Sequence, residues 1–399
     1  MGAGTDAGPR ARRLRILYHH RTQAEDGQAV HIRAMQRAFA AEGHEVFEVA
    51  LVRRAGPERR SAAPAGGRGW GAWARMPRFA RELAEYAYTS YARPKLVAEG
   101  RRSAVDFLYE RYAFGNLAGV QAARRLRKPL VLEVNSPMVL ELSRTRGLAF
   151  PRLARRVERH VLTAADRVCA VSGVLARMLE AEGVAPERLI VTPNGVDLEL
   201  YAERPGARQA ARAELGLAPE DLVLGFVGYY RDWHRLELAV DALARPELQR
   251  ARLVLIGGGP ARGDLERRAR EAGVASRVHF AEPRPHGEIP VLVAAFDVAL
   301  LPAINPYASP LKLIEYMAAA RAIVAPDQEN LRELLEPERN ALLVAPGDGQ
   351  ALAAALGRLA QDPALRERLG RAARASVIER DLTWRGNARR VVAAVRELL

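Results

Sequence analysis

The sequence of 399 residues contains a single cysteine, Cys169, so no disulfide can form within the chain. It has no run of about 18 or more uncharged apolar residues, so no transmembrane helix is expected. The basic N-terminal stretch holds no apolar segment before "LRILYHH", which argues against a secretory signal. These absences favour a cytosolic globular protein, and the length suits two or three domains.

Negative charge is in short supply: 61 Lys and Arg face 47 Asp and Glu, a formal net charge of +14. Such an excess suits nucleic acid, an anionic membrane or an anionic substrate as partner. Most arginines nevertheless stand beside acids in helical patterns such as "LRERLGRAARASVIERD", which is typical of a solvated helix face.

One basic stretch differs from the others. Residues 53–81 contain many cations, a single acid and the aromatic residues Trp70, Trp73 and Phe79. This composition fits an element that binds a membrane surface or an acceptor, and it fits equally an ordinary loop joined to a surface helix. Two locations therefore remain open: the cytosol alone, or the cytosol with peripheral attachment to the inner face of a membrane.

Short apolar runs rich in Val, Ile and Leu alternate with longer amphipathic segments. The runs lie at 14–20, 44–52, 104–112, 129–136, 165–172 and 188–197, and again at 221–230, 251–259, 277–282, 296–303, 322–326 and 341–346. Strands at helix-length spacing predict parallel sheets in an α/β fold. Because the pattern appears twice, we expect two doubly wound domains, 14–185 and 186–380, after a loose tail at 1–13.

In such sheets the functional residues lie in the loops that follow the strands. After the first strand, Gly27 and His31 open a helix whose free N–H groups could meet an anion, although the loop is not G-x-G-x-x-G and so argues against a dinucleotide oxidoreductase. In "FVGYYRDWHR", Arg231 is a candidate phosphate ligand beside Gly228 and His234, or else a cation in a surface turn. The run "GGG" around Gly258 permits close backbone approach.

The stretch "SPLKLIE" predicts a helix that starts with Ser309 as N-cap and Pro310 as first residue. Lys312 then lies in the first turn, where a cation costs about 0.3–1 kcal/mol unless an anion compensates it. Glu315, three residues later, could accept hydrogen bonds from hydroxyl groups. A bound nucleotide diphosphate explains both residues, and a surface Lys–Glu pair explains them equally well.

The motifs together resemble the retaining glycosyltransferases of family 4. The matching pieces are "DGQAVHIRAMQRAFAAEGHEV", "ADRVCAVS", "VTPNGVD", "FVGYYRDWHRLELAVDALA", "LVLIGGGP", "SPLKLIEYMAAARAIVA" and the late "TWRGNARRVVAAV". The resemblance implies an α/β GT-B fold, with two Rossmann-like domains facing a central cleft. It implies that 14–185 binds the acceptor, that 186–380 binds the nucleotide sugar, and that 381–399 is a helix crossing back to the first domain.

The resemblance also suggests roles for single residues. Glu315 would hold the donor ribose, and the helix start would lie by the phosphates with Lys312 and Arg231 as cations. The expected catalytic residues are Glu315, Lys312, Arg231 and Asn135. The expected donor-binding residues are Gly27, Gly228, His234, Gly258, Glu282, Arg284, Tyr307, Ala308, Ser309 and Leu311. His31 and Glu133 are expected to bind the acceptor.

Four positions depart from the family pattern. Tyr307 stands where many members have a second glutamate, and Asn135 stands where a histidine is frequent. His234 and Arg235 replace the usual Lys-Gly pair, so Lys312 could supply the missing cation. Ala320 replaces the usual glycine at the helix end.

The function implied is transfer of a sugar from a nucleotide-diphosphate donor, with UDP-sugars favoured over GDP-sugars. The acceptor would be a hydroxyl of a glycan, a lipid-linked saccharide or a small molecule. No D-x-D pair is evident, so neither a metal nor another cofactor is expected. Same-face attack without a carboxylate nucleophile is the hypothesis for retention. The alternatives are a basic nucleic-acid-binding protein, and an inactive GT-B subunit that serves a partner enzyme.

Overall fold

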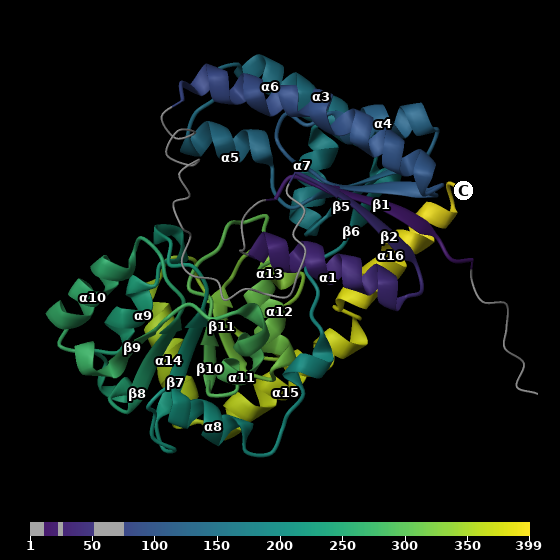
Figure 1. Ribbon diagram of the computed structural model, residues 1–399. Helices are drawn as coiled ribbons and strands as arrows, with labels where there is room; N and C mark the ends of the chain where they lie inside the picture. The colour runs from purple at the N-terminus through teal and green to yellow at the C-terminus, as the bar shows by residue number, and fades with distance from the viewer. Residues whose placement is uncertain (1–11, 23–26, 52–75) are drawn as a thin grey trace, which may run out of the picture.

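The computed structural model describes residues 12–22, 27–51 and 76–399 of the chain. These residues form two parallel six-stranded sheets with helices on both faces, in two lobes that Figure 1 shows one above the other. The prediction of two doubly wound α/β domains is confirmed. Most of the expected tail and most of the basic stretch 53–81 lie outside the described residues.

The first sheet has the strand order β2-β1-β3-β4-β5-β6. Its strands are β1 (Arg15–His20), β2 (Glu45–Ala50), β3 (Phe107–Arg111), β4 (Leu130–Val134), β5 (Arg167–Ala170) and β6 (Leu189–Val191). Its helices are α1 (Gly27–Ala41), α3 (Arg78–Arg102), α4 (Ala118–Leu126), α5 (Met138–Thr145), α6 (Pro151–Ala164) and α7 (Gly173–Ala181). Ile16 pairs with Val46 on one side and Phe107 on the other, so β1 is an interior strand.

The second sheet has the strand order β12-β11-β10-β7-β8-β9. Its strands are β7 (Leu222–Val227), β8 (Ala251–Ile256), β9 (Val278–Ala281), β10 (Val298–Leu300), β11 (Ala322–Pro326) and β12 (Leu342–Val344). The helices are α8 (Ala207–Glu214), α9 (Glu237–Ala242), α10 (Arg262–Glu271), α11 (Ile289–Val293), α12 (Leu311–Ala318), α13 (Glu329–Arg332), α14 (Gly349–Gln361), α15 (Pro363–Glu379) and α16 (Trp384–Arg396).

Both sheets are buried on two faces, which explains their nearly continuous apolar strands. In the second domain α9, α10 and α14 cover one face, and α11, α12 and α15 cover the other. In the first domain α3, α4, α6 and α7 cover one face. The opposite face is covered by α1 together with α16, a helix from the far end of the described chain.

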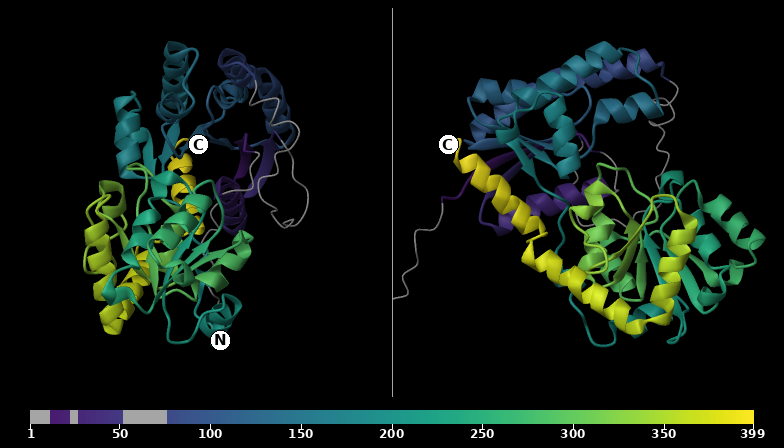
Figure 2. Two further views of the ribbon diagram at one scale, coloured as in Figure 1. Left: turned by 90° about the vertical axis from the view of Figure 1, so that its left-hand side faces the viewer. Right: turned by 180° about the vertical axis from the view of Figure 1, so that it is seen from behind.

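Helix α16 links the two domains. Its N-cap Thr383 accepts a hydrogen bond from the Gly386 N–H at 2.8 Å. Val391 and Val395 then pack into the same core as Ile16 and Tyr109 of the first sheet. The right-hand view of Figure 2 shows this yellow helix leaving the second lobe and lying along the first.

The chain passes between the domains twice, and the two passages touch. The Val196 N–H donates to the Leu382 carbonyl at 3.2 Å, and Val196 forms a parallel bridge with Thr383. The expected boundary after residue 185 falls too early, because Leu189 pairs with Val168 and β6 is therefore the last strand of the first sheet. The first domain continues to Val191 for this reason.

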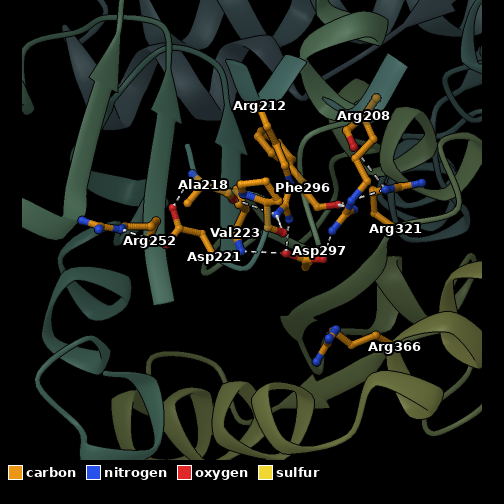
Figure 3. Close-up of polar contacts among 12 residues, drawn as sticks. Arg208, Arg212, Ala218, Asp221, Val223, Arg252, Phe296, Asp297, Arg321 and Arg366 are labelled. Atoms are coloured by element: carbon orange, nitrogen blue, oxygen red, sulfur yellow. Dashed lines mark hydrogen bonds and ion pairs between the residues drawn. The ribbon is translucent and has the colours of Figure 1, made fainter. Parts of the chain in front are cut away.

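Arginines also stabilise the fold far from any candidate site. At the N-terminal edge of the second sheet, Asp297 accepts hydrogen bonds from the Val223 N–H and from Arg212, both at 2.7 Å, and it pairs with Arg208 (Figure 3). Arg321 donates to the Phe296 carbonyl at 2.9 Å in the same group. Part of the positive charge of the chain is therefore structural.

None of the helices in the described ranges is both long and apolar enough to cross a bilayer. Within the same ranges, no three His, Cys, Asp or Glu side chains gather in a way that could hold a metal ion.

Candidate active site

The strand orders place a switch point in each sheet, where neighbouring strands send their connections to opposite faces. In the second sheet it lies between β7 and β10, because α9 and α12 cover different faces. In the first sheet it lies between β1 and β3. Ligands of doubly wound folds bind beyond the strand ends at these points. The loops around Gly27, Gly228 and Lys312 occupy them.

Helix α12 starts one residue later than expected. Its N-cap is Pro310 and its first residue is Leu311, so Lys312 is the second residue and not the third. Ser309 does not cap the helix, because its Oγ accepts instead from the Asn194 N–H at 3.1 Å. The cation still lies in the first turn, where the partial positive charge of the helix end opposes it.

Lys312 reaches back toward the end of β7. Its Nζ lies 3.9 Å from the centroid of the Phe226 ring and 3.5 Å from His234 Nε2. A Cβ atom on Gly228 would lie only 2.7 Å from this Nζ, and the φ of Gly228 is +141°. Glycine is therefore required here by the backbone and by the space that the lysine fills.

The surroundings of Lys312 do not neutralise its charge. Burial lowers the pKa of Lys312 to about 7. Burial, and then the nearby lysine charge, lower the pKa of His234 to about 3, so this ring is neutral near pH 7. The ammonium thus contacts an aromatic face and a neutral imidazole. An anion at the helix N-terminus would restore its charge.

Glu315 lies on the next turn of α12 and is 5% exposed. Its Oε1 is 2.6 Å from Nε2 of His286, which belongs to the loop after β9. Burial, followed by the Glu315 carboxylate, raises the pKa of Tyr201. Glu315 therefore has one oxygen in contact with His286 and lies near the phenol of Tyr201.

A second group of side chains, the first-domain cluster, surrounds a buried carboxylate on β4. Glu133 is 1% exposed. It accepts from Tyr109 Oη at 2.8 Å, from Asn135 Nδ2 at 2.6 Å and from Arg111. His31 Nε2 lies 3.0 Å from Oε2, the oxygen that also accepts from Tyr109, whereas Asn135 and Arg111 donate to Oε1. Burial alone would raise the pKa of Glu133, but the charges of His31 and Arg111 and the hydrogen bonds hold it well below its usual range.

Asn194, from the "PNG" loop, connects the first-domain cluster to α12. Its Oδ1 is 2.7 Å from Nδ1 of His31, and its Nδ2 donates to the carbonyl of Ser309. Gly27 lies against Leu311 as well, since a Cβ on Gly27 would be 3.5 Å from the leucine Cδ1. The N-termini of α1 and α12 therefore meet at the junction of the domains.

Several predicted residues lie elsewhere. Arg231 stacks between two exposed rings, 4.7 Å from the Tyr229 centroid and 4.9 Å from the Trp233 centroid, and lines a groove of about 400 Å³ between α9 and α10. No contact joins it to Lys312 in the described part of the chain. Glu282 pairs with Arg262, and Arg284 pairs with Glu214 and Glu288 at the surface.

Gly258 supports the loop after β7. Its carbonyl accepts from the Tyr230 N–H at 2.7 Å, and a Cβ on its neighbour Gly259 would collide with the Tyr230 backbone. The glycine run therefore serves close contact between two loops. Ala308 is fixed by Asn330 Nδ2, which donates to its carbonyl at 2.7 Å. Tyr307 points into the first domain, where its hydroxyl donates to Glu141 Oε1 at 2.5 Å.

Sequence patterns missed four residues that hold these groups in place: Asn194, His286, Arg111 and Glu141. Asn194 was part of a quoted motif, and its role depends on partners distant in sequence. Arg111 follows the last buried residue of β3, so the rule that places functional residues after strands could have found it. No local pattern marks His286 or Glu141.

Two family models match the chain in succession. Glycosyltransferase Family 4 covers residues 26–200, and Glycosyl transferases group 1 covers residues 207–376. The chain belongs to glycosyltransferase family 4. The predicted family membership is thereby confirmed, and the two family regions meet between residues 200 and 207, just after the loop that contains Asn194.

Curated relatives agree with this assignment. A D-inositol 3-phosphate glycosyltransferase of Nocardia farcinica is 33% identical over 278 residues, which make up 67% of this chain and 60% of the relative. The match therefore spans less than two thirds of that protein. A D-inositol 3-phosphate glycosyltransferase of Kribbella flavida is 30% identical over 301 residues, 71% of this chain and 70% of its own length.

Solved structures confirm the fold of the chain. HepE of Anabaena in complex with UDP has a TM-score of 0.72 at 19% identity, and the match covers 96% of this chain and 100% of that one. At this identity the likeness shows the fold alone, which is GT-B as predicted.

Proposed function

We propose that the chain transfers a sugar from a nucleotide-diphosphate sugar to an acceptor hydroxyl, with retention at the anomeric carbon. The observation that carries the proposal is the pair Lys312 and Glu315, one turn apart on α12 at the switch point of the second sheet. An anion at the helix start would meet Lys312 and free N–H groups, and hydroxyls of an attached ribose would meet Glu315.

The proposed reaction needs no protein nucleophile. The bond between the anomeric carbon and the diphosphate oxygen breaks, and the acceptor oxygen bonds to the same face of that carbon. The acceptor proton passes to the departing diphosphate oxygen. Lys312 and the N-terminus of α12 stabilise the charge that develops there, so the protein itself supplies positive charge to the leaving group.

A uridine nucleotide is the favoured donor, and a guanosine nucleotide is the alternative. HepE binds UDP and UDP-glucose in solved structures, which supports the uridine donor. The acceptor is a hydroxyl-bearing glycan, lipid-linked saccharide or small molecule. The names of the relatives point to a phosphorylated cyclitol as the first small molecule to test.

A thermal-shift panel of UDP-, GDP-, ADP- and TDP-sugars tests the donor. Specific binding stabilises the native protein by RT ln(1 + [L]/Kd), so the true donor is expected to raise Tm most, followed by release of its diphosphate when acceptor is added. Random duplex DNA at physiological salt serves as the control. Stabilisation by DNA with no response to any sugar nucleotide would favour nucleic-acid binding and contradict the proposal.

We also propose that the first domain attaches to an anionic membrane surface. Phe79 and Leu83 on α3 are 53% and 50% exposed, and Phe150 and Leu153 at the start of α6 are 37% and 41% exposed. The two pairs are neighbours, because Glu82 on α3 accepts hydrogen bonds from the Phe150 N–H. Large apolar side chains gathered in this way mark interaction surfaces.

The charge around this apolar patch favours anionic lipid. Arg152, Arg155 and Arg156 on α6 are exposed, and none of them forms an ion pair within the described ranges. The nearby acid Glu158 is buried, and Glu85 is paired with Arg146 at 2.8 Å. Apolar anchors beside uncompensated arginines suit the interface of an anionic membrane.

Sedimentation with vesicles tests the attachment. The Phe79→Ser, Leu153→Ser double variant is expected to lose binding to vesicles of phosphatidylglycerol and phosphatidylcholine, whereas Ile378→Ser is the matched control. Ile378 is 57% exposed on α15 of the second domain, away from the patch. Equal binding by wild type to pure phosphatidylcholine, or equal loss in the control, would contradict the assignment.

A further inference from the structure

Tyr307 belongs to the second domain by sequence and to the first domain by packing. It lies in the loop between β10 and α12, yet it is 8% exposed within the apolar core that contains Leu132 and Val171 of the first domain. Its hydroxyl donates to Glu141 Oε1 on α5 at 2.5 Å. A residue of the donor-side loop is therefore anchored in the opposite domain.

The backbone of the same residue is held as well. Ser172 Oγ donates to the Tyr307 carbonyl at 2.8 Å, and the same Oγ caps α7 by accepting from the Leu175 N–H at 3.0 Å. Beside it, the Glu333 carboxylate of the second domain accepts from the Gly173 N–H at 2.7 Å. The start of α7 thus binds the second domain at two adjacent points.

From Glu141 the contacts lead to the first-domain cluster. The second oxygen of Glu141 accepts from Ser136 Oγ at 3.1 Å, and the preceding residue Asn135 donates to Glu133. On the other side, Tyr307 stands two residues before Ser309, whose hydroxyl and carbonyl are held by Asn194. A continuous chain of contacts joins the loop after β4 to the N-terminus of α12.

We propose that Tyr307 is a positioning residue, which couples the acceptor-side loop at 135–141 to the donor-side loop at 305–311. The inference rests on the proposed sugar transfer. Through the contact between Tyr307 and Glu141, an acceptor bound near Asn135 stabilises the donor-side loop in the arrangement that the reaction needs. When the acceptor is absent this loop is less firmly held, and the donor reacts slowly with water.

The residue type fits the coupling. Burial, followed by the contact with Glu141, raises the pKa of Tyr307, so its hydroxyl remains a donor to the carboxylate. A glutamate at this position, as many family members have, would face Glu141 with a like charge. Tyr307 and Glu141 therefore form a matched pair between the two domains.

Tyr307→Phe is the direct test, because it removes only the hydroxyl. Two rates are measured with the full chain: transfer to the acceptor, and release of free sugar from the donor without acceptor. The ratio of hydrolysis to transfer is expected to rise about tenfold, the usual size of a coupling between sites, while the Kd for the free nucleotide changes less than about twofold.

Tyr112→Phe is the matched control. Tyr112 is also 8% exposed, and its hydroxyl donates to Glu158 at 3.1 Å, but both partners lie in the first domain. This variant is expected to lose stability without altering the ratio. The variant Glu141→Ala, alone and combined with Tyr307→Phe, completes a double-mutant cycle in which the effects are expected not to add.

Three outcomes overturn the proposal: an unchanged ratio in Tyr307→Phe, additive effects in the cycle, or a loss of nucleotide affinity as large as the loss of transfer. The last would make Tyr307 a direct donor contact. Failure of the proposed function gives a different result, since the wild type itself would then neither transfer nor hydrolyse any sugar nucleotide.

Discussion

The first-domain cluster and the N-terminus of α12 both contain a buried ionisable group, but only the first surrounds that group with partners that compensate its charge. Glu133 is surrounded by His31, Tyr109, Arg111 and Asn135, and its charge is fully compensated. Lys312 has a neutral imidazole and an aromatic ring beside it, and no carboxylate of the described residues forms an ion pair with it. The first group is complete as it stands, whereas the second gains free energy when an anion arrives. The first-domain cluster is thus preorganised without a ligand, whereas the N-terminus of α12, across the domain junction, depends on a bound anion for its compensation.

The largest effect is expected from a substitution in the first-domain cluster, where the charge of Glu133 is compensated. Glu133→Ala leaves the Arg111 guanidinium without its carboxylate and removes the acceptor of Tyr109, Asn135 and His31, so the free energy of unfolding is expected to fall by about 3–5 kcal/mol. Urea unfolding measures it. Glu367→Ala, which breaks an exposed pair with Arg371 on α15, is the control and is expected to cost less than about 0.5 kcal/mol. Similar costs for both variants would mean that the Glu133 charge is not compensated as described.

The next effect concerns Glu315. Glu315→Gln weakens the acceptor that we assign to the donor ribose, so kcat/KM is expected to fall about 30- to 150-fold, the equivalent of about 2–3 kcal/mol. Calorimetry with nucleotide and initial rates with the sugar donor measure binding and turnover separately. Unchanged kinetics would remove Glu315 from the site and leave Lys312 as an isolated cation.

The charge state of Lys312 predicts a pH dependence of binding. Since its pKa is about 7 without ligand, binding a diphosphate above pH 7 takes up a proton. Affinity for a nucleoside diphosphate is therefore expected to weaken by up to tenfold per unit as pH rises above about 7, and to vary less in Lys312→Arg. The free nucleoside, without phosphate, is expected to bind independently of this proton.

The stability of the protein without ligand also depends on pH through Lys312, but it rises with pH where the affinity for a diphosphate falls. The pKa of Lys312 is lower in the folded state than its ordinary value of 10.5, so the unfolded chain binds more protons between about pH 7 and 10.5. The contribution of Lys312 to stability therefore improves as pH rises through this window. A Lys312→Met variant that keeps the wild-type pH profile would contradict the lowered pKa.

The smallest expected effect concerns the other end of α12. Ala320 has a φ of +54°, in the left-handed region that favours glycine. Ala320→Gly relieves this strain and is expected to raise the free energy of unfolding by about 0.5–1 kcal/mol, after the entropy of the unfolded glycine is included. Thermal unfolding measures it, and catalysis is expected to be unchanged. A lower Tm would show that the alanine methyl contributes more by packing than its backbone costs.

The sheets, and the place of Lys312 at a helix start, could be predicted because their signals are local. Buried strands such as Leu222–Val227 are apolar runs at helix spacing, and Lys312 stands at a helix end that disfavours a cation. The predicted run 188–197 contains β6, but the expected domain boundary fell a few residues too early, because a three-residue strand between loops does not show to which sheet it belongs. Its pairing with β5 decides the boundary.

The remaining features depend on contacts between distant segments. Tyr307 and Glu141 are 166 residues apart, and nothing in either neighbourhood indicates that they meet. Arg231 is a predicted phosphate ligand from its place after a strand, and the sequence does not show that its guanidinium lies between the exposed rings of Tyr229 and Trp233. A residue type in the right loop predicts a candidate, and only tertiary packing decides where its side chain points.

Helix α16 has a consequence for synthesis on the ribosome. The strands of the first sheet are complete at Val191, but the face that contains Ile16 and Tyr109 is covered only in part, by α1, until α16, beginning at Trp384, has emerged. The nascent first domain therefore exposes an apolar surface during translation of the whole second domain. Domains usually fold in the order in which they emerge, but here the second can close first. Chaperone binding to arrested nascent chains would reveal that interval.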